Sequence, residues 1–362
     1  MKERRSSPFM LSETQAALVL LLPFFAVYFC FLVYPFAQGL WISLHDWNLL
    51  KVAFNPSAKE FVGLENYRRL FWGRDVEWHP LHRPVPQGLG FIMLALVGWG
   101  WRRWRREVLF VAIVMAGILI VGWGFHLGED GRWFDRRFWP TVARTVTFVA
   151  LTVPLIVIIS LLLAAALNQR TRAMAVLRTL FFVSQVLSVT VVTLIWQIMF
   201  SPRQGLIANV FEGLSVEPLT WLTNEHLAMP ALVITTVWWS IGIAVMLFLA
   251  GLQDINPEIY EASEMDGATA VQSFFLITIP NIGTTLLLVS VLQIVLHFQV
   301  FGQSHLMTSG GPNDETQVLV RYIYQTAFRD SEMGRASAMA MTLFVIIGGF
   351  SLLQFLLGRR RQ

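Results

Sequence analysis

The sequence predicts an all-α, polytopic membrane protein. Of its 362 residues, 55% are hydrophobic and only 14% are charged, whereas soluble globular domains carry about 25% charged residues. Long apolar runs recur along the chain, and the arginines gather beside them. A net charge of +4 could indicate nucleic-acid binding, but arginines next to apolar runs are typical of the signal that orients membrane proteins. We therefore expect a lipid membrane as the surroundings and no nucleic-acid partner.

Six segments are apolar enough, over the roughly 20 residues required, to cross a bilayer as helices. They are residues 16–42, 142–166, 177–200, 229–252, 281–301 and 336–357. Two weaker segments, residues 88–101 and 108–125, flank the turn RRWRR at 102–106 and would form a transmembrane hairpin. The first run follows basic residues, as in a signal peptide, but it is too long and no clear cleavage site follows it. We expect it to stay as a span.

The distribution of arginines predicts the orientation. With eight spans and a cytoplasmic N-terminus, the cytoplasmic segments are residues 2–5, 102–106, 170–178, 253–279 and 359–361. Four of these five segments are basic, as the positive-inside rule requires. Six spans also keep both termini in the cytoplasm, whereas seven do not, and the arginine turn favours eight.

Several chemistries are disfavoured by what the sequence lacks. The central parts of the six clear spans hold no Asp, Glu, Lys or Arg, and His297 is the one ionisable side chain at depth. Ion-driven transporters keep such groups inside their spans. A phosphate-binding loop needs Lys after Gly, and no Gly-Lys pair occurs. With the single cysteine Cys30, neither a disulfide within the chain nor a cysteine metal site can form. We expect no catalytic residues, no metal and no cofactor.

The loop at residues 253–279 is acidic, with five Asp or Glu and no Lys or Arg. Asn256 suits a helix N-cap, and Pro257 suits the first helical position. The predicted helix runs to about Met265, and Gly267 ends it; a second helical stretch, residues 268–275, leads to the next span. Glu258, Glu261 and Met265 would share one face. This face could pair with basic residues of a soluble partner, or the loop could be a solvated connector.

This loop resembles the cytoplasmic signature of permeases from binding-protein-dependent ATP-binding-cassette (ABC) importers. That signature reads Glu-Ala-Ala, three residues, Gly, and about nine more to Ile-x-x-Pro. The chain has Glu261-Ala262-Ser263, then Asp266-Gly267-Ala268, then Ile277 and Pro280. Ser263 in place of the second alanine is the departure, a small residue for a small residue.

Further motifs resemble the carbohydrate-uptake branch of these permeases. They are Tyr34-Pro35, residues 43–47, FVGLENY at 61–67, Trp221-Leu222, AGLQ at 250–253, residues 308–312 and Ala336-Ser337-Ala338. The resemblance implies three parts. They are an N-terminal span with an external segment (residues 1–70), an inserted segment with two extra spans (71–138), and the core permease domain (139–362). The fold implied is a six-helix type I importer core plus the hairpin.

The resemblance also implies partners and roles. Loop 253–279 would be a coupling helix, seated in a groove of a cytoplasmic ATPase subunit. Two ATPase copies, a second and different permease subunit, and an external solute-binding protein would complete the importer. Glu261 would pair with a basic ATPase residue, Ala262 would pack closely and Gly267 would set the bend. The coupling site as a whole would comprise Glu258, Glu261, Ala262, Asp266, Gly267, Ala268 and Pro280, with Pro280 starting the next span.

Polar and aromatic residues in the spans are candidates for the substrate pathway, because sugars are recognised by hydrogen-bonding groups and ring faces. They are Thr193, Trp196, Gln197, Trp239, Ser240, Gln293 and His297. Such residues can instead join neighbouring helices.

The expected function is therefore that of a cell-membrane permease subunit that transports a sugar or sugar-like solute, with ATP hydrolysed elsewhere. A secondary transporter, which would need ionisable residues or broken helices at mid-depth, and a membrane subunit without a pathway are the alternatives. Polyols and glycerol phosphates stay open as solutes, although the central spans lack the Arg or Lys that a phosphate would require.

Overall fold

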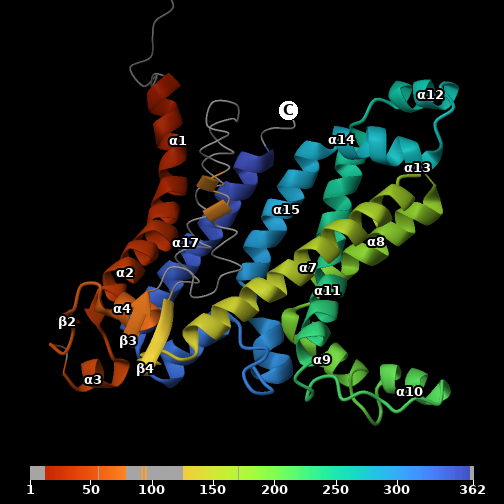
Figure 1. Ribbon diagram of the computed structural model, residues 1–362. Helices are drawn as coiled ribbons and strands as arrows, with labels where there is room; N and C mark the ends of the chain where they lie inside the picture. The colour runs from red at the N-terminus through yellow and green to blue at the C-terminus, as the bar shows by residue number, and fades with distance from the viewer. Residues whose placement is uncertain are drawn as a thin grey trace, which may run out of the picture. The chain divides into compact units, whose positions relative to one another are not determined.

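The computed structural model describes residues 13–55, 57–78, 91–92, 94–95, 125–169 and 171–358. The chain forms two compact units, and Figure 1 labels their helices and strands. The first unit comprises the residues up to Tyr67 together with Thr326–Met341. The second unit comprises Arg68–Gln325 together with the residues from Thr342 onward.

The first unit begins with one long, continuous helical rod. Its elements, in chain order, are α1 (Glu13–Tyr28), η1 (Phe29–Val33, a π-helical turn), α2 (Tyr34–Ser43), β1 (His45–Asp46), α3 (Leu49–Phe54) and β2 (Glu60–Phe61). Helix α4 (Glu65–Phe71), η4 (Gln325–Arg329) and α17 (Met333–Gly358) have residues in both units. The segment Ala17–Ser43 is long and apolar enough to span a membrane, and no residue of its apolar window is buried. An exposed apolar helical segment of this length is typical of a membrane span.

Asn66, in the FVGLENY motif, attaches this motif to the end of the first span. Its amide donates to the backbone oxygens of Ser43 and His45, each at 2.9 Å, so it ties α4 to the end of α2. The segment after α2 is also joined to the residues before α17. The Leu49 N–H donates to the Ser331 oxygen at 2.8 Å, and the Gly334 N–H donates to the Trp47 oxygen at 3.1 Å.

The second unit contains most of the helices. Its elements are β3 (Gly73–Trp78), β4 (Phe125–Trp133), α7 (Phe138–Ala166), α8 (Arg172–Val186), α9 (Val189–Met199), α10 (Leu206–Gly213), α11 (Ala228–Gln253), α12 (Pro257–Met265), α13 (Ala270–Ser273), η2 (Phe274–Thr278), α14 (Ile279–Asn281), α15 (Gly283–Phe298), η3 (Ser304–Thr308) and α16 (Leu319–Tyr324). Helix α11 packs against α7, α8 and α15. Small residues permit this close approach: a Cβ added to Gly242 of α11 would lie 2.5 Å from the Phe181 oxygen of α8.

The structure confirms six apolar regions but not six straight spans. Four helices are long and apolar enough to cross a membrane: Ala17–Ser43, Phe138–Ala166, Ala228–Gln253 and Met333–Gln354. The other two regions are bent pairs, and counting each pair as one span raises the total to six. The prediction of one straight helix over residues 177–200 is wrong, because α8 and α9 meet at 102°. The helix predicted over residues 281–301 is present as α15 (Gly283–Phe298), and the segment before it, Ala270–Asn281, meets it at 71°.

The first bend has a local cause. Leu187 leaves α8 in an extended conformation, and Ser188 starts α9 as an N-cap that accepts a hydrogen bond from the Val191 N–H. The Leu187 oxygen, which the break frees, accepts a bond from the indole N–H of Trp239 at 3.1 Å. Broken helices, which the sequence did not reveal, therefore occur in this chain, and a tryptophan of α11 supports one of them.

Two short antiparallel pairs correct the all-α prediction. β1 pairs with β2, and β3 pairs with β4. In the second pair Gly73 faces Trp133 and Trp78 faces Phe125. The last residue of β3 therefore lies beside the first residue of β4. The expected hairpin of residues 88–101 and 108–125 lies almost wholly outside the described residues.

Candidate functional site

Helix α12 forms where the sequence predicts it, at the end of unit 2 where α11 stops (Figure 1). The Asn256 side chain caps the helix by accepting from the Glu258 N–H at 3.1 Å, and Pro257 occupies the first turn. Gly267 has φ +78°, the left-handed conformation that ends helices. The turn is closed by the Ala268 N–H, which donates to the Ser263 oxygen at 3.0 Å.

The segment after α12 starts two residues later than expected. Thr269 forms a capping box with Gln272, so α13 begins at Ala270 rather than at residue 268. Pro280 lies in α14, before the bend at Ile282, and so does not itself begin the long helix α15.

Ser263, the departure from the importer signature, is buried and joins the two arms of this helical turn. Its hydroxyl bonds to the Ser273 hydroxyl at 3.1 Å and donates to the Tyr260 oxygen at 2.9 Å. The Tyr260 hydroxyl in turn bonds to Thr278 at 2.9 Å. Since both Ser263 and Tyr260 face the following helices, the opposite side of α12 faces outward.

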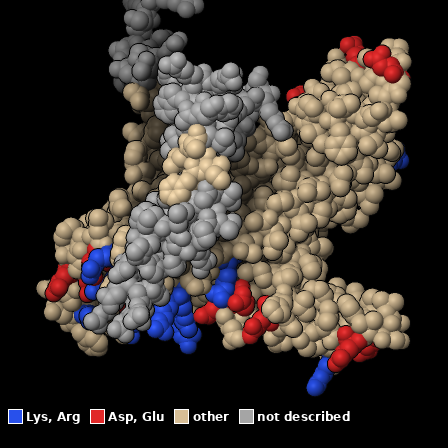
Figure 2. Space-filling view, viewed as in Figure 1, with Lys and Arg blue, Asp and Glu red and all other residues tan. Residues whose placement is uncertain are grey.

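The outward side of α12 is an exposed acidic face, made by Glu258, Glu261, Ala262 and Met265. Met265 is 84% exposed although it is apolar. In Figure 2, Asp and Glu side chains gather over α12, and the surface of unit 2 between this end and the opposite one carries almost no charge in this view. Asp266 and Gly267 are exposed beside the face, and Ala268 is half-buried.

Two of the predicted pathway residues use their N–H groups to support irregular backbone. Trp239 donates to Leu187 at the bend, and the Gln197 amide donates to the Leu306 oxygen of η3 at 2.8 Å. A second, longer bond joins Gln197 to the Met307 oxygen. These contacts connect α9 and α11 to breaks in neighbouring helices, which is a packing role.

The other predicted pathway residues lie at different depths in unit 2. Gln293 and His297 are buried in α15, and His297 Nδ1 bonds to the Gln293 backbone oxygen at 2.7 Å. Gln293 Oε1 has no hydrogen-bond partner among the described residues. Thr193 is buried and bonds to its own helix, whereas Trp196 and Ser240 are half-buried. The structure thus joins Gln293 and His297 by a hydrogen bond within α15.

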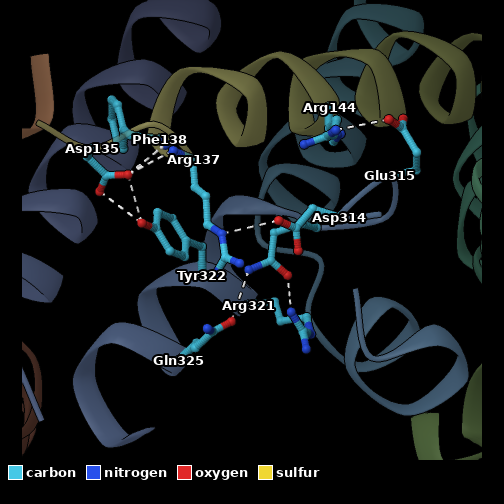
Figure 3. Close-up of polar contacts among 10 residues, drawn as sticks. Asp135, Arg137, Phe138, Arg144, Asp314, Glu315, Arg321, Tyr322 and Gln325 are labelled. Carbon is cyan, nitrogen blue, oxygen red and sulfur yellow. Dashed lines mark hydrogen bonds and ion pairs between the residues drawn. The ribbon is translucent and has the colours of Figure 1, made fainter. Parts of the chain in front are cut away.

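The opposite end of unit 2 carries a polar cluster that sequence reasoning missed (Figure 3). Asp135 is buried, and its carboxylate accepts from the N–H groups of Arg137 and Phe138, both at 3.0 Å, at the start of α7. The Tyr322 hydroxyl donates to the same carboxylate at 2.8 Å. Asp135 therefore joins the start of α7 to α16, across 187 positions of sequence.

Three consecutive residues of the loop before α16 extend this cluster. Asp314 forms an ion pair with Arg137 at 3.2 Å, and Glu315 forms one with Arg144 at 2.9 Å (Figure 3). Asn313 bonds to Glu225 of the loop before α11. Asn313 and Asp314 both have positive φ, so this loop adopts a conformation that local propensity disfavours, and its contacts compensate for that cost. No group of His, Cys, Asp and Glu suited to a metal ion occurs in the described part of the chain.

A family model described as "Binding-protein-dependent transport system inner membrane component" matches residues 120–362. The chain belongs to this family. It is a multi-pass protein of the inner membrane and the permease component of a transport system.

Several curated relatives resemble this permease over most of its length. The probable ABC transporter permease protein YurN of Bacillus subtilis is 26% identical over 332 residues, which cover 91% of each chain. The arabinooligosaccharides transport system permease protein AraP of Halalkalibacterium halodurans is 30% identical over 68% of this chain and 78% of its own. The trehalose/maltose transport system permease protein MalF of Thermococcus litoralis is 25% identical over 97% of this chain and 96% of its own.

Solved structures share the fold of the permease. A chain of a bacterial alginate ABC transporter, in complex with an alginate pentasaccharide-bound periplasmic protein, superposes with a TM-score of 0.56 at 20% identity, covering 76% of this chain and 96% of that chain. A second structure of a bacterial ABC transporter involved in alginate import gives the same TM-score at 19% identity. At this identity the likeness describes the fold alone.

Proposed function

We propose that this permease, paired with a second permease subunit, forms the pathway through which an ABC importer moves a sugar or sugar-like solute. Two separate ATPase subunits supply the energy, and an external solute-binding protein delivers the solute. The observation that carries the proposal is the exposed acidic face of α12, on a helical turn stiffened by Ser263, at the residues that resemble the importer signature.

The acidic face is suited to docking in a basic groove. Loop 253–279 contains no Lys or Arg that would neutralise its carboxylates internally. In the proposed coupling site Glu261 pairs with a basic ATPase residue, and Ala262 and Met265 pack against the groove. Gly267 and Ala268 form the turn after α12, and α14, which contains Pro280, connects this region to α15. A movement of the ATPase is thereby transmitted to the core through packed helices.

A carbohydrate is the proposed solute class because relatives at 25–30% identity carry out transport of oligosaccharides and disaccharides according to their names. The lack of Lys and Arg between residues 203 and 321 favours a neutral solute over a phosphorylated one. Two pathway candidates have a buried polar atom with no partner among the described residues, and so have spare hydrogen-bonding capacity: Gln293 through its side-chain oxygen and Trp196 through its indole N–H. Thr193, Ser240 and His297 remain candidates beside them.

We also propose the eight-span topology, with both termini in the cytoplasm and residues 71–138 as the inserted segment. The pairing of Trp78 with Phe125 supports it, because a chain that leaves and returns at one place crosses the membrane an even number of times. The topology can be measured with a membrane-impermeant thiol reagent on intact cells, in a Cys30→Ser background. Ser57→Cys should react from outside, and Arg105→Cys only after permeabilisation; reaction of Arg105→Cys in intact cells would refute the proposed hairpin.

The transport proposal is tested with the complex purified from cells that co-express the permease with the ATPase, second permease and binding protein encoded beside it. We expect uptake of labelled neutral oligosaccharides into proteoliposomes that requires both ATP and the binding protein. Glycerol phosphate serves as the charged comparison. Uptake driven by an ion gradient without ATP would indicate a secondary transporter. If the co-expressed binding protein did not stimulate ATP hydrolysis, the importer assignment would be contradicted.

A further inference from the structure

Helix α10 has three distinct sides. Ile207, Ala208 and Phe211 face the protein, and Ala208 is fully buried among them. Asn209 and Glu212 lie exposed on a second side. A third side is apolar and open.

The open apolar side is a stripe at helical spacing. Leu206 is 59% exposed, Val210 56% and Leu214 70%, and residues four apart lie on one side of a helix. A soluble protein would rarely leave such a stripe in water. Helix α10 therefore has one side packed on protein, one side suited to water and one side suited to an apolar environment. Such a helix fits a place where protein, water and an apolar phase meet.

The attachment of α10 places it at the level where two membrane segments end. Gly205, its N-cap, lies against the end of α9: a Cβ there would be 2.5 Å from the Met199 oxygen. After α10 the chain returns to the start of α11, a candidate span. Phe200, at the end of α9, packs against Trp221 of that return, with the ring centroids 5.2 Å apart.

Helix α9, which precedes α10 and packs against it, also has an apolar side that faces outward. Val191, Leu194 and Ile198 of α9 are exposed at a spacing of three and four residues, in the second half of a bent candidate span. Trp196 and Trp238 meet beside this surface with ring centroids 5.8 Å apart. Tryptophans are enriched where membrane spans meet water.

We propose that α10 lies in the plane of the membrane surface, at the end of unit 2 opposite α12, with Leu206, Val210 and Leu214 in contact with lipid. Asn209 and Glu212 then face water, as in amphipathic helices that lie at the interface. Lipid is favoured over a protein partner because the polar side adjoins the apolar stripe directly and because α10 packs against α9, whose exposed apolar residues belong to a bent candidate span. This role is independent of the proposed transport function.

Two neighbouring positions provide a matched test. In a Cys30→Ser background, Val210→Cys and Asn209→Cys each receive the same environment-sensitive fluorophore, and the full-length permease is placed in nanodiscs that contain nitroxide-labelled phosphatidylcholine. We expect the label at position 210 to show blue-shifted emission and stronger quenching by the nitroxide lipid than by iodide. The label at position 209 should show the reverse order.

Leu214→Cys and Glu212→Cys form a second pair that should behave like positions 210 and 209 respectively. Equal iodide quenching and no lipid quenching at positions 210 and 214 would overturn the proposal. So would labels that lipid does not quench but that become shielded when the second permease or the binding protein is added, because a protein would then cover the stripe. The measurement needs neither ATP nor solute, so its result is separate from that of the uptake assay.

Discussion

Replacing Gly267 with valine is expected to abolish ATP-driven uptake, whereas asparagine at the same position should preserve most of it. Gly267 has φ +78° and no atom within 4 Å of the position its Cβ would occupy, so the obstacle to a side chain is the backbone alone. The left-handed conformation costs an L-residue about 1–2 kcal/mol, and a β-branched residue is a true outlier there, whereas asparagine tolerates it. Valine would therefore reshape the turn between α12 and α13.

A substitution in the acidic face of α12 tests the coupling role of the loop independently of Gly267. Truncating one partner of a buried charge pair costs about 2–5 kcal/mol, so Glu261→Ala should weaken ATPase binding more than about tenfold. Asp254→Ala removes an exposed carboxylate from the same loop, before the start of α12 and outside the acidic face, and is the matched control. Copurification of the ATPase and stimulated ATP hydrolysis are the measurements. If Glu261→Ala and Gly267→Val both retain full uptake while remaining inserted, the loop is only a connector.

Asp135→Ala is expected to lower the free energy of unfolding of the permease by about 2–4 kcal/mol. The substitution takes the acceptor from the N–H groups of Arg137 and Phe138 at the start of α7, a loss of about 1 kcal/mol. It also takes the charged acceptor from the Tyr322 hydroxyl, a bond that contributes about 1.5–3 kcal/mol. Asp135 is 6% exposed, so water cannot readily replace the carboxylate. The measurement is the thermal or denaturant midpoint of the purified protein in nanodiscs.

Two variants separate the parts of this effect. Tyr322→Phe should reproduce only the loss of the hydroxyl bond. Arg137→Ala breaks an ion pair whose side chains are 55% and 38% exposed, and exposed pairs contribute about 0–1 kcal/mol. A midpoint for Asp135→Ala no lower than that for Arg137→Ala would mean that the buried carboxylate does not stabilise the junction of α7 and α16.

Composition and local pattern were sufficient to predict where the chain is apolar and helical. Every one of the six clear runs corresponds to a helix or a bent helix pair. The short helix α12 was also predictable, because Asn256, Pro257 and Gly267 act through bonds to residues close in sequence. The acidic face of α12 follows from the same helical spacing.

Features that depend on distant partners were not predictable. The bend between α8 and α9 involves a cap at Ser188, but its free carbonyl is satisfied by Trp239, 52 residues away. Ser263 looks like a neutral change for alanine until Ser273 is seen beside it. The strands β3 (GRDVEW) and β4 (FHLGEDGRW) show no sustained alternation of apolar and polar residues, and each forms only because the other lies alongside.

The sequence by itself therefore determined the membrane environment, the apolar helices and the acidic turn, because each depends on the solvent or on neighbours within a few residues. Only the tertiary structure decided how the helices break and how Asp135 joins α7 to α16. It also decided which side of α10 is left open. Those features depend on hydrogen bonds and packing between segments far apart in the chain, and a single sequence contains no direct record of which segments meet.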